Sequence, residues 1–352
     1  MSCRAIALVF CVLLTSQSVC AQSVRIGVFG LFRPHQLEVR STPGAAIVVR
    51  AGDSTFVLEP GSNRDVARIR VSSGAIILEI GERVVPASEI LATSRSGGAV
   101  GFVLAIPNKI SRRYVGALRV RVISGVLIPV VTMDMETAVA STVQAESFPG
   151  APLEALKAQA VAARSYFTAG KGRHRNFDFC DTTHCQFLRD PPSVKSLALE
   201  ATRATRGLVL AYHDHPFAAM FTRSCGGRLR TPEELGMPTR GYPYFAVVCD
   251  YCRRNPIRWT RKIPRQDAAG LKADSELSRL AIDRRLGWDA VPSNNFTIHI
   301  EGQDAILEGT GKGHGIGLCQ RGASAMAEAG ADFREILSHY YPNATIVTIH
   351  PH

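Results

Sequence analysis

The chain has 352 residues, and 46% of them are hydrophobic, which is ample for real cores and allows two domains. Its formal net charge of +11 favours a polyanionic partner, either a cell envelope or nucleic acid. No zinc-finger, RNA-recognition or helix-turn-helix pattern is present, and basic residues do not alternate with aromatic ones. Nucleic acid is therefore not the partner we expect.

Residues 1–21 have the features of a secretory signal. Arg4 supplies the positive start, Ala5 to Leu14 the apolar core, and Val19-Cys20-Ala21 a small-residue cleavage site. The apolar run is too short to span a bilayer, and no later segment offers about 18 uninterrupted apolar residues. A retained anchor, or lipidation at Cys20, is the weaker alternative. We expect an exported protein of the periplasm, cell wall or extracellular space, without a stable membrane span after cleavage.

Residues 22–110 are predicted to form a small β-rich module. Short runs of β-branched residues recur, separated by Gly, Ser, Asn and Asp clusters. These runs are 24–28, 46–49, 54–58, 67–71 and 75–80. No cluster of catalytic residue types occurs here, which indicates a structural sandwich or barrel-like module.

A predicted strand pair over 114–132, turning at Ser124-Gly125, is followed by a helix over 133–143. A second helix is predicted from Pro152, because apolar residues recur at intervals of three and four as far as Phe167. Lys157 and Arg164 are seven residues apart and share another face of this helix. Glu146 precedes it in a turn.

Cysteine and histidine residues gather in two segments. His174, Cys180 and Cys185 are metal-ligand types within twelve residues, with His184 available as a fourth, but a Cys180–Cys185 disulfide fits the spacing equally well. Further on, Cys225 is followed by the pair Cys249 and Cys252, which indicates a structural role. Whether Cys225 joins that pair as metal ligand or disulfide partner is open, as is the state of Cys319.

The charged stretch 253–285 is predicted to be helical and mainly solvated, with Trp259 and Trp288 near its ends. The segment 309–323 then places five alternating glycines around His314, so that backbone can approach a ligand or another segment closely. It lacks the spacing of a phosphate-binding loop. His314 is therefore a candidate site residue. Helices are predicted over 320–329 and 332–341.

Taken together, these segments resemble the SpoIID family, the group of stage II sporulation protein D and the LytB amidase enhancer. The resemblance runs over about two thirds of the chain, from Tyr114 to the end. Its matching segments are Tyr114 to Leu118, Met133 to Glu136, Ala145 to Pro149, Glu154 to Tyr166, Cys180 to Gln186, Ser224 to Gly227, Tyr242 to Tyr244 and Gly313 to Ala323. Compared with the usual Glu-Met-Pro, one residue is inserted between Glu146 and Pro149.

The resemblance implies an α+β fold over residues 111–352, a SpoIID-like catalytic domain with a cleft. It implies a lytic transglycosylase that cleaves peptidoglycan glycan strands between N-acetylmuramic acid (MurNAc) and N-acetylglucosamine (GlcNAc) and leaves a 1,6-anhydro product. Glu146 matches the catalytic glutamate, a general acid/base. Lys157, Arg164, His314 and Gln320 match other motif positions, as expected substrate-binding residues. Some members bind zinc at the segment matching His174, Cys180 and Cys185, where we expect a structural role.

Two other functions remain open at this stage. One is a non-catalytic peptidoglycan-binding protein that enhances a separate cell-wall amidase, which would then be its partner. The other is a zinc hydrolase of stem peptides, which would need an open metal position. A lytic reaction is consistent with a single catalytic carboxyl group, because the sugar's own hydroxyl replaces the water that a second carboxylate usually activates.

Overall fold

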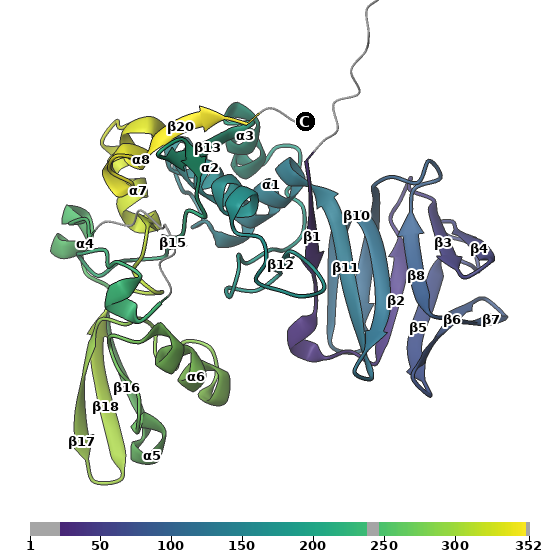
Figure 1. The fold of residues 1–352 in the computed structure, drawn as a ribbon, viewed down its shortest axis with the longest axis horizontal. Coiled ribbons are helices and arrows are strands. Elements are labelled where there is room, and N and C mark those ends of the chain that lie inside the picture. Colours follow the sequence, from purple (N-terminus) through teal and green to yellow (C-terminus); the bar gives the residue numbers. More distant parts are fainter. Residues whose placement is uncertain (1–21, 238–245, 350–352) are drawn as a thin grey trace, which may run out of the picture.

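The structure is a computed structural model that describes residues 22–237 and 246–349. Figure 1 shows a β-rich end, a central group of helices and a smaller lobe. The secretory signal predicted for 1–21 and the Tyr242–Tyr244 motif lie outside the described residues. No helix in the described ranges is long and apolar enough to cross a membrane.

The β-rich end is built from the first eleven strands, which belong to one antiparallel network with the short β12 (Phe179–Cys180) at its edge. Their bounds are β1 Ser23–Gly27, β2 Gln36–Ser41, β3 Ile47–Ala51, β4 Ser54–Leu58, β5 Val66–Ser72, β6 Ala75–Ile80, β7 Arg83–Ala87, β8 Glu89–Thr93, β9 Val100–Ile106, β10 Ile110–Ile123 and β11 Val126–Asp134. The predicted strand runs are all present. Strands β2, β7, β8 and β9 were not predicted.

Strand β10 joins the two halves of this network. Its first half pairs with β9, and its second half pairs with both β11 and β8. The change occurs after Gly116, where an added Cβ would lie 2.5 Å from the carbonyl oxygen of Thr132. At the other end, Ser124 and Gly125 both have positive φ, as a two-residue hairpin turn requires. This hairpin confirms the predicted strand pair, and strands on both sides of residue 110 share the sheet.

The central part packs five helices around short strands (Figure 1). Its elements are α1 Met135–Glu146, α2 Leu153–Ala169, α3 Leu197–Ala204, β13 Leu208–Tyr212, β14 His215–Pro216, β15 Phe221–Thr222, β19 Leu318–Cys319, α7 Gln320–Glu328, α8 Phe333–Tyr340 and β20 Thr345–Thr348. The predicted helices α2, α7 and α8 are confirmed. The helix predicted over 133–143 is also present as α1, but it begins two residues later, after β11, and ends three residues later. Helix α2 contacts α1, α3, α7, α8 and β13. It is buried continuously from Ala158 to Phe167, rather than along one face.

Arg164 was expected to bind substrate, but it lies inside this helical core and does not line a cleft. Its side chain is fully buried and forms a bidentate ion pair with Glu136, at 2.8 and 2.7 Å. It also donates to the main-chain carbonyls of Leu208 and Thr202, at 3.0 and 3.2 Å. All three guanidinium nitrogens are thus used to join α2, which carries Arg164, to α1, α3 and the start of β13.

Lys157, on the same predicted face, pairs instead with Glu154 at 2.6 Å. The other carboxylate oxygen of Glu154 accepts the N–H of Phe333, at the start of α8. Lys157 therefore lies at the junction of α2 with α8, and neither predicted basic residue faces the cavity described below.

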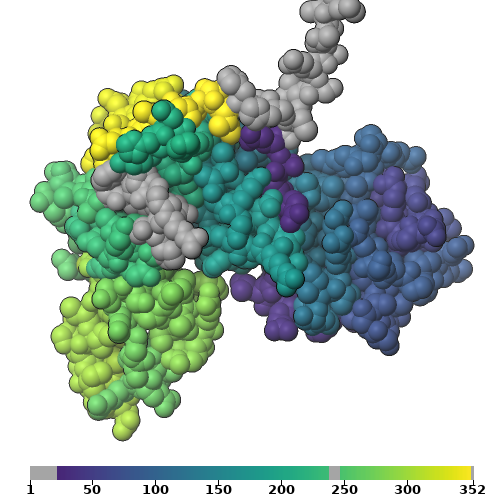
Figure 2. Space-filling model, in the orientation of Figure 1, coloured from purple at the N-terminus to yellow at the C-terminus, as the bar shows by residue number. Residues whose placement is uncertain are grey.

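The lobe contains β16 Arg258–Pro264, α5 Arg265–Ala268, α6 Glu276–Leu286, β17 Phe296–Glu301 and β18 Asp304–Thr310. The short helix α4 (Asp250–Arg254) precedes it in sequence and packs against α7 of the central part. Its three strands have the order β16-β18-β17, and a separate small core includes Trp259, Ile263 and Leu307. Figure 2 shows the lobe projecting from the rest of the surface, with a recess between it and the β-rich end. The predicted helical stretch is thus only partly helical.

We predict that Arg164→Ala destabilises the fold by about 3–5 kcal/mol, because it leaves Glu136 and two carbonyls without their partner. Urea unfolding followed by circular dichroism measures this loss. Lys157→Ala is the control, since a more exposed pair contributes about 0.2–1 kcal/mol. Unchanged stability of the Arg164 variant would contradict the structural role.

Candidate active site

A cavity of about 510 Å³ lies between the helical core and the lobe. Of the residues expected to act on substrate, Glu146, His314 and Gln320 line it, together with the predicted metal ligand Cys185. Other lining side chains that matter below are Gln186, Arg223, Glu276, Arg279, Asp283, Trp288 and Lys312. The sequence segments that meet here are separated by up to 174 residues.

Glu146 is the last residue of α1, so its carboxyl group sits at the helix end rather than in a separate turn. Its Oε1 accepts the main-chain N–H of Phe187 at 2.9 Å. Burial raises the pKa of this carboxyl group to about 7, although the Phe187 hydrogen bond and the charge of Arg223 act in the opposite direction. Near neutral pH a substantial fraction of Glu146 is therefore a carboxylic acid that can give up its proton.

The main-chain carbonyl of Glu146 is held from two directions. The last carbonyls of a helix lack intrahelical donors, and this one accepts from Arg223 Nη1 at 2.7 Å and from Gln320 Nε2 at 3.0 Å. The Arg223 guanidinium also lies over the ring of Phe148, 3.4 Å from its centre. Gln320 thus has a defined contact with the glutamate itself, and the two donors fix the helix end that carries the acid.

His314 lies in the glycine-rich segment and is neutral in this environment. Its Nδ1 accepts the N–H of Ile316 at 3.0 Å, which leaves the ring proton on Nε2. Burial lowers the pKa of His314 below its ordinary value. Gly317 has positive φ, and a Cβ there would collide with the carbonyl of Met220, so glycine is needed for this close approach.

Helix α6 contributes a charged network to the site that the sequence pattern did not predict. Arg279 is 8% exposed and donates to both oxygens of Glu276, at 2.6 and 2.9 Å, and to Asp283 at 2.8 Å. Burial acts to raise the pKa of Glu276, but the hydrogen bonds and charge of Arg279 outweigh it and lower that pKa. The expectation that basic residues here are solvated is wrong for Arg279.

Two more lining residues, Gln186 and Trp288, stand out by their environment. Gln186 is 3% exposed and donates to the carbonyl of Ala163 at 3.1 Å, while its Oε1 has no partner among the described residues. Trp288 is 53% exposed beside the same cavity. Gln186 lies within the motif Cys180–Gln186, and Arg223 directly precedes the motif Ser224–Gly227. Both could therefore have been predicted as site residues from the sequence, whereas Trp288 lies in no motif.

The predicted metal ligands do come together. One ligand atom from each of His174, Cys180, His184 and Cys185 lies within 4.8 Å of all the others. His174 Nε2 is 3.2 Å from Cys185 Sγ, and Cys180 Sγ is 3.8 Å from His184 Nδ1. Zinc bonds of about 2.0–2.3 Å to nitrogen and sulfur fit such spacings. Cys180 and Cys185 are not joined by a disulfide.

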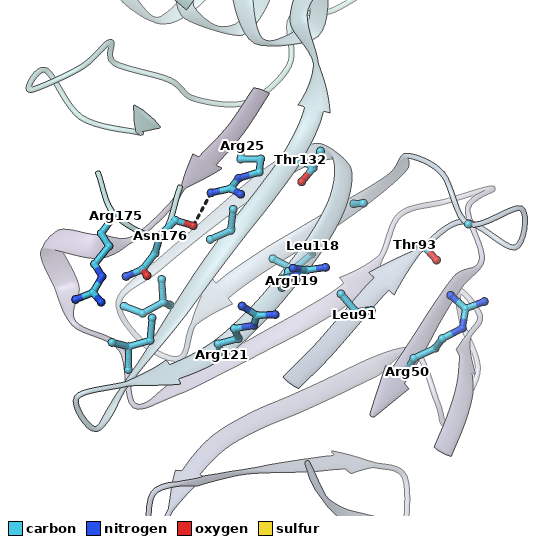
Figure 3. A pocket seen from close by; sticks show the side chains of 15 residues that line it. Arg25, Arg50, Leu91, Thr93, Leu118, Arg119, Arg121, Thr132, Arg175 and Asn176 are labelled. Atoms are coloured by element: carbon cyan, nitrogen blue, oxygen red, sulfur yellow. Dashed lines mark hydrogen bonds between the residues drawn. The ribbon is translucent and has the colours of Figure 1, made fainter. Parts of the chain in front are cut away.

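A second hollow, of about 550 Å³, lies on the β-rich end (Figure 3). Five arginines line it, namely Arg25, Arg50, Arg119, Arg121 and Arg175, and no carboxylate does. Arg119 and Arg121 approach Glu89 at its edge, whereas Arg50 and Arg175 form no ion pair with any described residue. This hollow can attract anions, but it offers no acid, base or nucleophile for catalysis.

Comparison with known proteins identifies a family for the chain. The SpoIID family profile, described as stage II sporulation protein, matches residues 124–212, which carry Glu146 and the His174–Cys185 group. An uncharacterized protein of Brachyspira hyodysenteriae is 30% identical over 268 residues, covering 66% of this chain and 72% of its own. Stage II sporulation protein D of Bacillus amyloliquefaciens is 25% identical over 243 residues, which cover 55% of this chain and 68% of that protein.

The amidase enhancer of Bacillus subtilis is 38% identical over 63 residues, which are 18% of this chain and 9% of that protein. The relatives with long alignments therefore match more than half of the chain, whereas this one matches a single short segment.

We predict that Glu146→Gln stabilises the folded state relative to wild type as pH rises from about 4.5 to about 7. A carboxyl group whose folded pKa is raised contributes stability below its unfolded pKa, and this contribution is lost as pH rises through the folded value. With partial exposure allowed for, the free energies of unfolding of variant and wild type should differ by about 2 kcal/mol at pH 7, as measured by urea unfolding. A difference that is constant with pH would contradict the raised pKa.

Proposed function

The chain belongs to the SpoIID family, and we propose that it is a lytic transglycosylase that cleaves peptidoglycan glycan strands between MurNAc and GlcNAc. The observation that carries the proposal is Glu146, an acid with a pKa of about 7 at the wall of a 510 Å³ cavity. An acid with a pKa near neutral pH is in part protonated there, which suits the protonation of a glycosidic oxygen. We propose that this cavity is the catalytic cleft.

The reaction needs one carboxyl group acting twice. Glu146 first donates its proton to the glycosidic oxygen, and the bond from the MurNAc C1 to that oxygen breaks, which leaves positive charge at C1. The Glu146 carboxylate then takes the proton of the same sugar's 6-hydroxyl, and the 6-oxygen bonds to C1. The glutamate regains its proton, the 1,6-anhydro ring closes, and no water is consumed.

Neighbouring residues fit supporting roles in that sequence. Arg223 and Gln320 hold the main chain of Glu146, so that the carboxyl group keeps its aim during both steps. The exposed ring of Trp288 offers an apolar face against which a sugar ring can pack.

Zinc held by His174, Cys180, His184 and Cys185 is part of the proposal as a structural ion. When bound, it would fix the loop that carries Phe187, whose N–H contacts the Glu146 carboxylate. Four protein ligands close a tetrahedral site, whereas a hydrolytic zinc needs an open position. This ligand set therefore favours the glycan reaction over a zinc hydrolase of stem peptides.

The proposed substrate lies in the cell envelope, so the proposal includes export by the signal predicted at residues 1–21. The five arginines of the β-rich hollow supply positive charge suited to an anionic wall. A cell-wall amidase is the candidate partner, because one relative is named an amidase enhancer. If purified protein releases no glycan fragments but accelerates an amidase, the non-catalytic enhancer function holds instead.

We predict that Glu146→Gln lowers the release of anhydro-muropeptides by roughly 10²–10⁴-fold, because the amide cannot donate the catalytic proton. Binding to purified glycan strands should persist, since the amide oxygen can still accept the Phe187 N–H. Mass spectrometry of the released products measures the loss. Glu59→Gln, on an exposed ion pair of the β-rich end, is the control and should act as wild type. Equal release by both variants would refute the role of Glu146.

We predict that Trp288→Ala raises KM for glycan strands by roughly 3- to 10-fold, as expected for an aromatic contact of about 0.5–1.5 kcal/mol, and leaves kcat nearly unchanged. Trp288→Phe keeps an aromatic face and should stay close to wild type. Initial rates at several strand concentrations separate the two parameters. Equal KM values for all three proteins would remove Trp288 from the binding surface.

A further inference from the structure

Four cysteines outside the cavity form a second compact group. Cys225, Cys249, Cys252 and Cys319 are all buried, and their four sulfur atoms lie within 4.8 Å of one another. Cys225 follows β15, Cys249 and Cys252 flank and enter α4, and Cys319 ends β19. None of them forms a disulfide in the described structure. Three distant segments therefore bring one sulfur cluster together.

We propose that these four cysteines bind a zinc ion as a closed tetrathiolate site. Bonds of about 2.3 Å to a central zinc place tetrahedral sulfurs about 3.8 Å apart, and Cys252 Sγ already lies 3.5 Å from Cys319 Sγ. Because no two of the four sulfur atoms are more than 4.8 Å apart, the space among them fits a single ion. Four thiolates with tetrahedral geometry select zinc or iron among biological metals. On binding, each thiol releases its proton and contributes one sulfur–metal bond.

The surroundings of the sulfurs support charged thiolates. The N–H of Cys225 donates to Cys319 Sγ at 3.4 Å. The hydroxyl of Ser224 lies 3.6 Å from Cys252 Sγ, and that of Tyr340 lies 3.5 Å from Cys249 Sγ. Donors around coordinating sulfurs orient metal ligands and stabilise their charge. Four buried thiols without a metal would give these donors only weak acceptors.

The cluster is positioned to hold the catalytic frame. Cys225 lies two residues after Arg223, and Cys319 directly precedes Gln320. These are the two side chains that donate to the main-chain carbonyl of Glu146. An ion that joins Cys225 to Cys319 would therefore fix the spacing of both donors. This positioning role rests on the proposed function, whereas metal binding itself does not.

Metal content tests the site directly. The full mature chain, purified from zinc-supplemented cells, should carry a zinc at the four-cysteine site besides the one proposed at the His174–Cys185 group. The zinc of the four-cysteine site should be lost in Cys252→Ser and in Cys319→Ser and kept in Cys185→Ser. Cys185→Ser removes a ligand of the other group and so isolates the four-cysteine site. Elemental analysis by mass spectrometry gives the stoichiometry. If Cys185→Ser protein carries no metal and Cys252→Ser protein keeps it, the proposal fails.

Two disulfides are the competing state, and they have a separate signature. The denatured wild-type chain would then be lighter by four hydrogen atoms and would lack the four thiols in a titration under chelator. The zinc site predicts all four as free thiols. Cobalt added to metal-free Cys185→Ser protein should also give the intense sulfur-to-metal absorption of four thiolates. Because these tests use wild type and Cys185→Ser, they hold even if the other cysteine variants do not fold.

The positioning role has its own readout. Removal of this zinc should release Arg223 from Glu146, and loss of that positive charge should shift the Glu146 titration to higher pH. Carbon NMR of labelled glutamate in Cys185→Ser protein, with and without metal, measures the shift. Metal binding without a shift would leave a zinc site that does not position Glu146. If the wild-type protein released no lytic products from glycan strands, the proposed function would fail, but the evidence for metal binding would stand.

Discussion

The main-chain carbonyl of Glu146 is the point on which the site depends. A helix end leaves its last carbonyls without donors, and here Arg223 and Gln320, 77 and 174 residues away, supply them. These two bonds attach the C-terminal half of the chain to the segment that matches the SpoIID profile. Without them, the acid would lie on a helix end free to fray. The cavity is thus assembled by long-range polar contacts on a buried helical core.

Within one cavity, two glutamates are driven to opposite states. Glu146 is buried beside a single backbone donor and a more distant guanidinium, so that burial prevails and its pKa rises to about 7. Glu276 is buried as well, but the bidentate contact with Arg279 prevails and lowers its pKa. Both residues are glutamates, so the opposite pKa shifts come from their surroundings and not from the residue type. This contrast makes Glu146 the group able to donate a proton at neutral pH.

The local elements followed from the sequence because their causes are local. The periodicity of 153–167 predicted α2, and Ser124-Gly125 predicted the hairpin. The role of Arg164 did not follow, because spacing defines a helix face but not what packs against it. Arg279 and Trp288 were missed as site residues for the same reason, since the lobe folds toward the cavity through contacts distant in sequence. Glu146, His314 and Gln320 were found through motif resemblance, not through periodicity.

The central claim is that a single protonated glutamate cuts the glycan strand by internal attack of a sugar hydroxyl. The most direct measurement is digestion of purified glycan strands by the wild-type protein alone in water enriched in ¹⁸O, with mass spectrometry of the new ends. The account predicts 1,6-anhydro ends that lack the elements of water and contain no ¹⁸O. Reducing ends that carry ¹⁸O, or no cleavage at all, would contradict it.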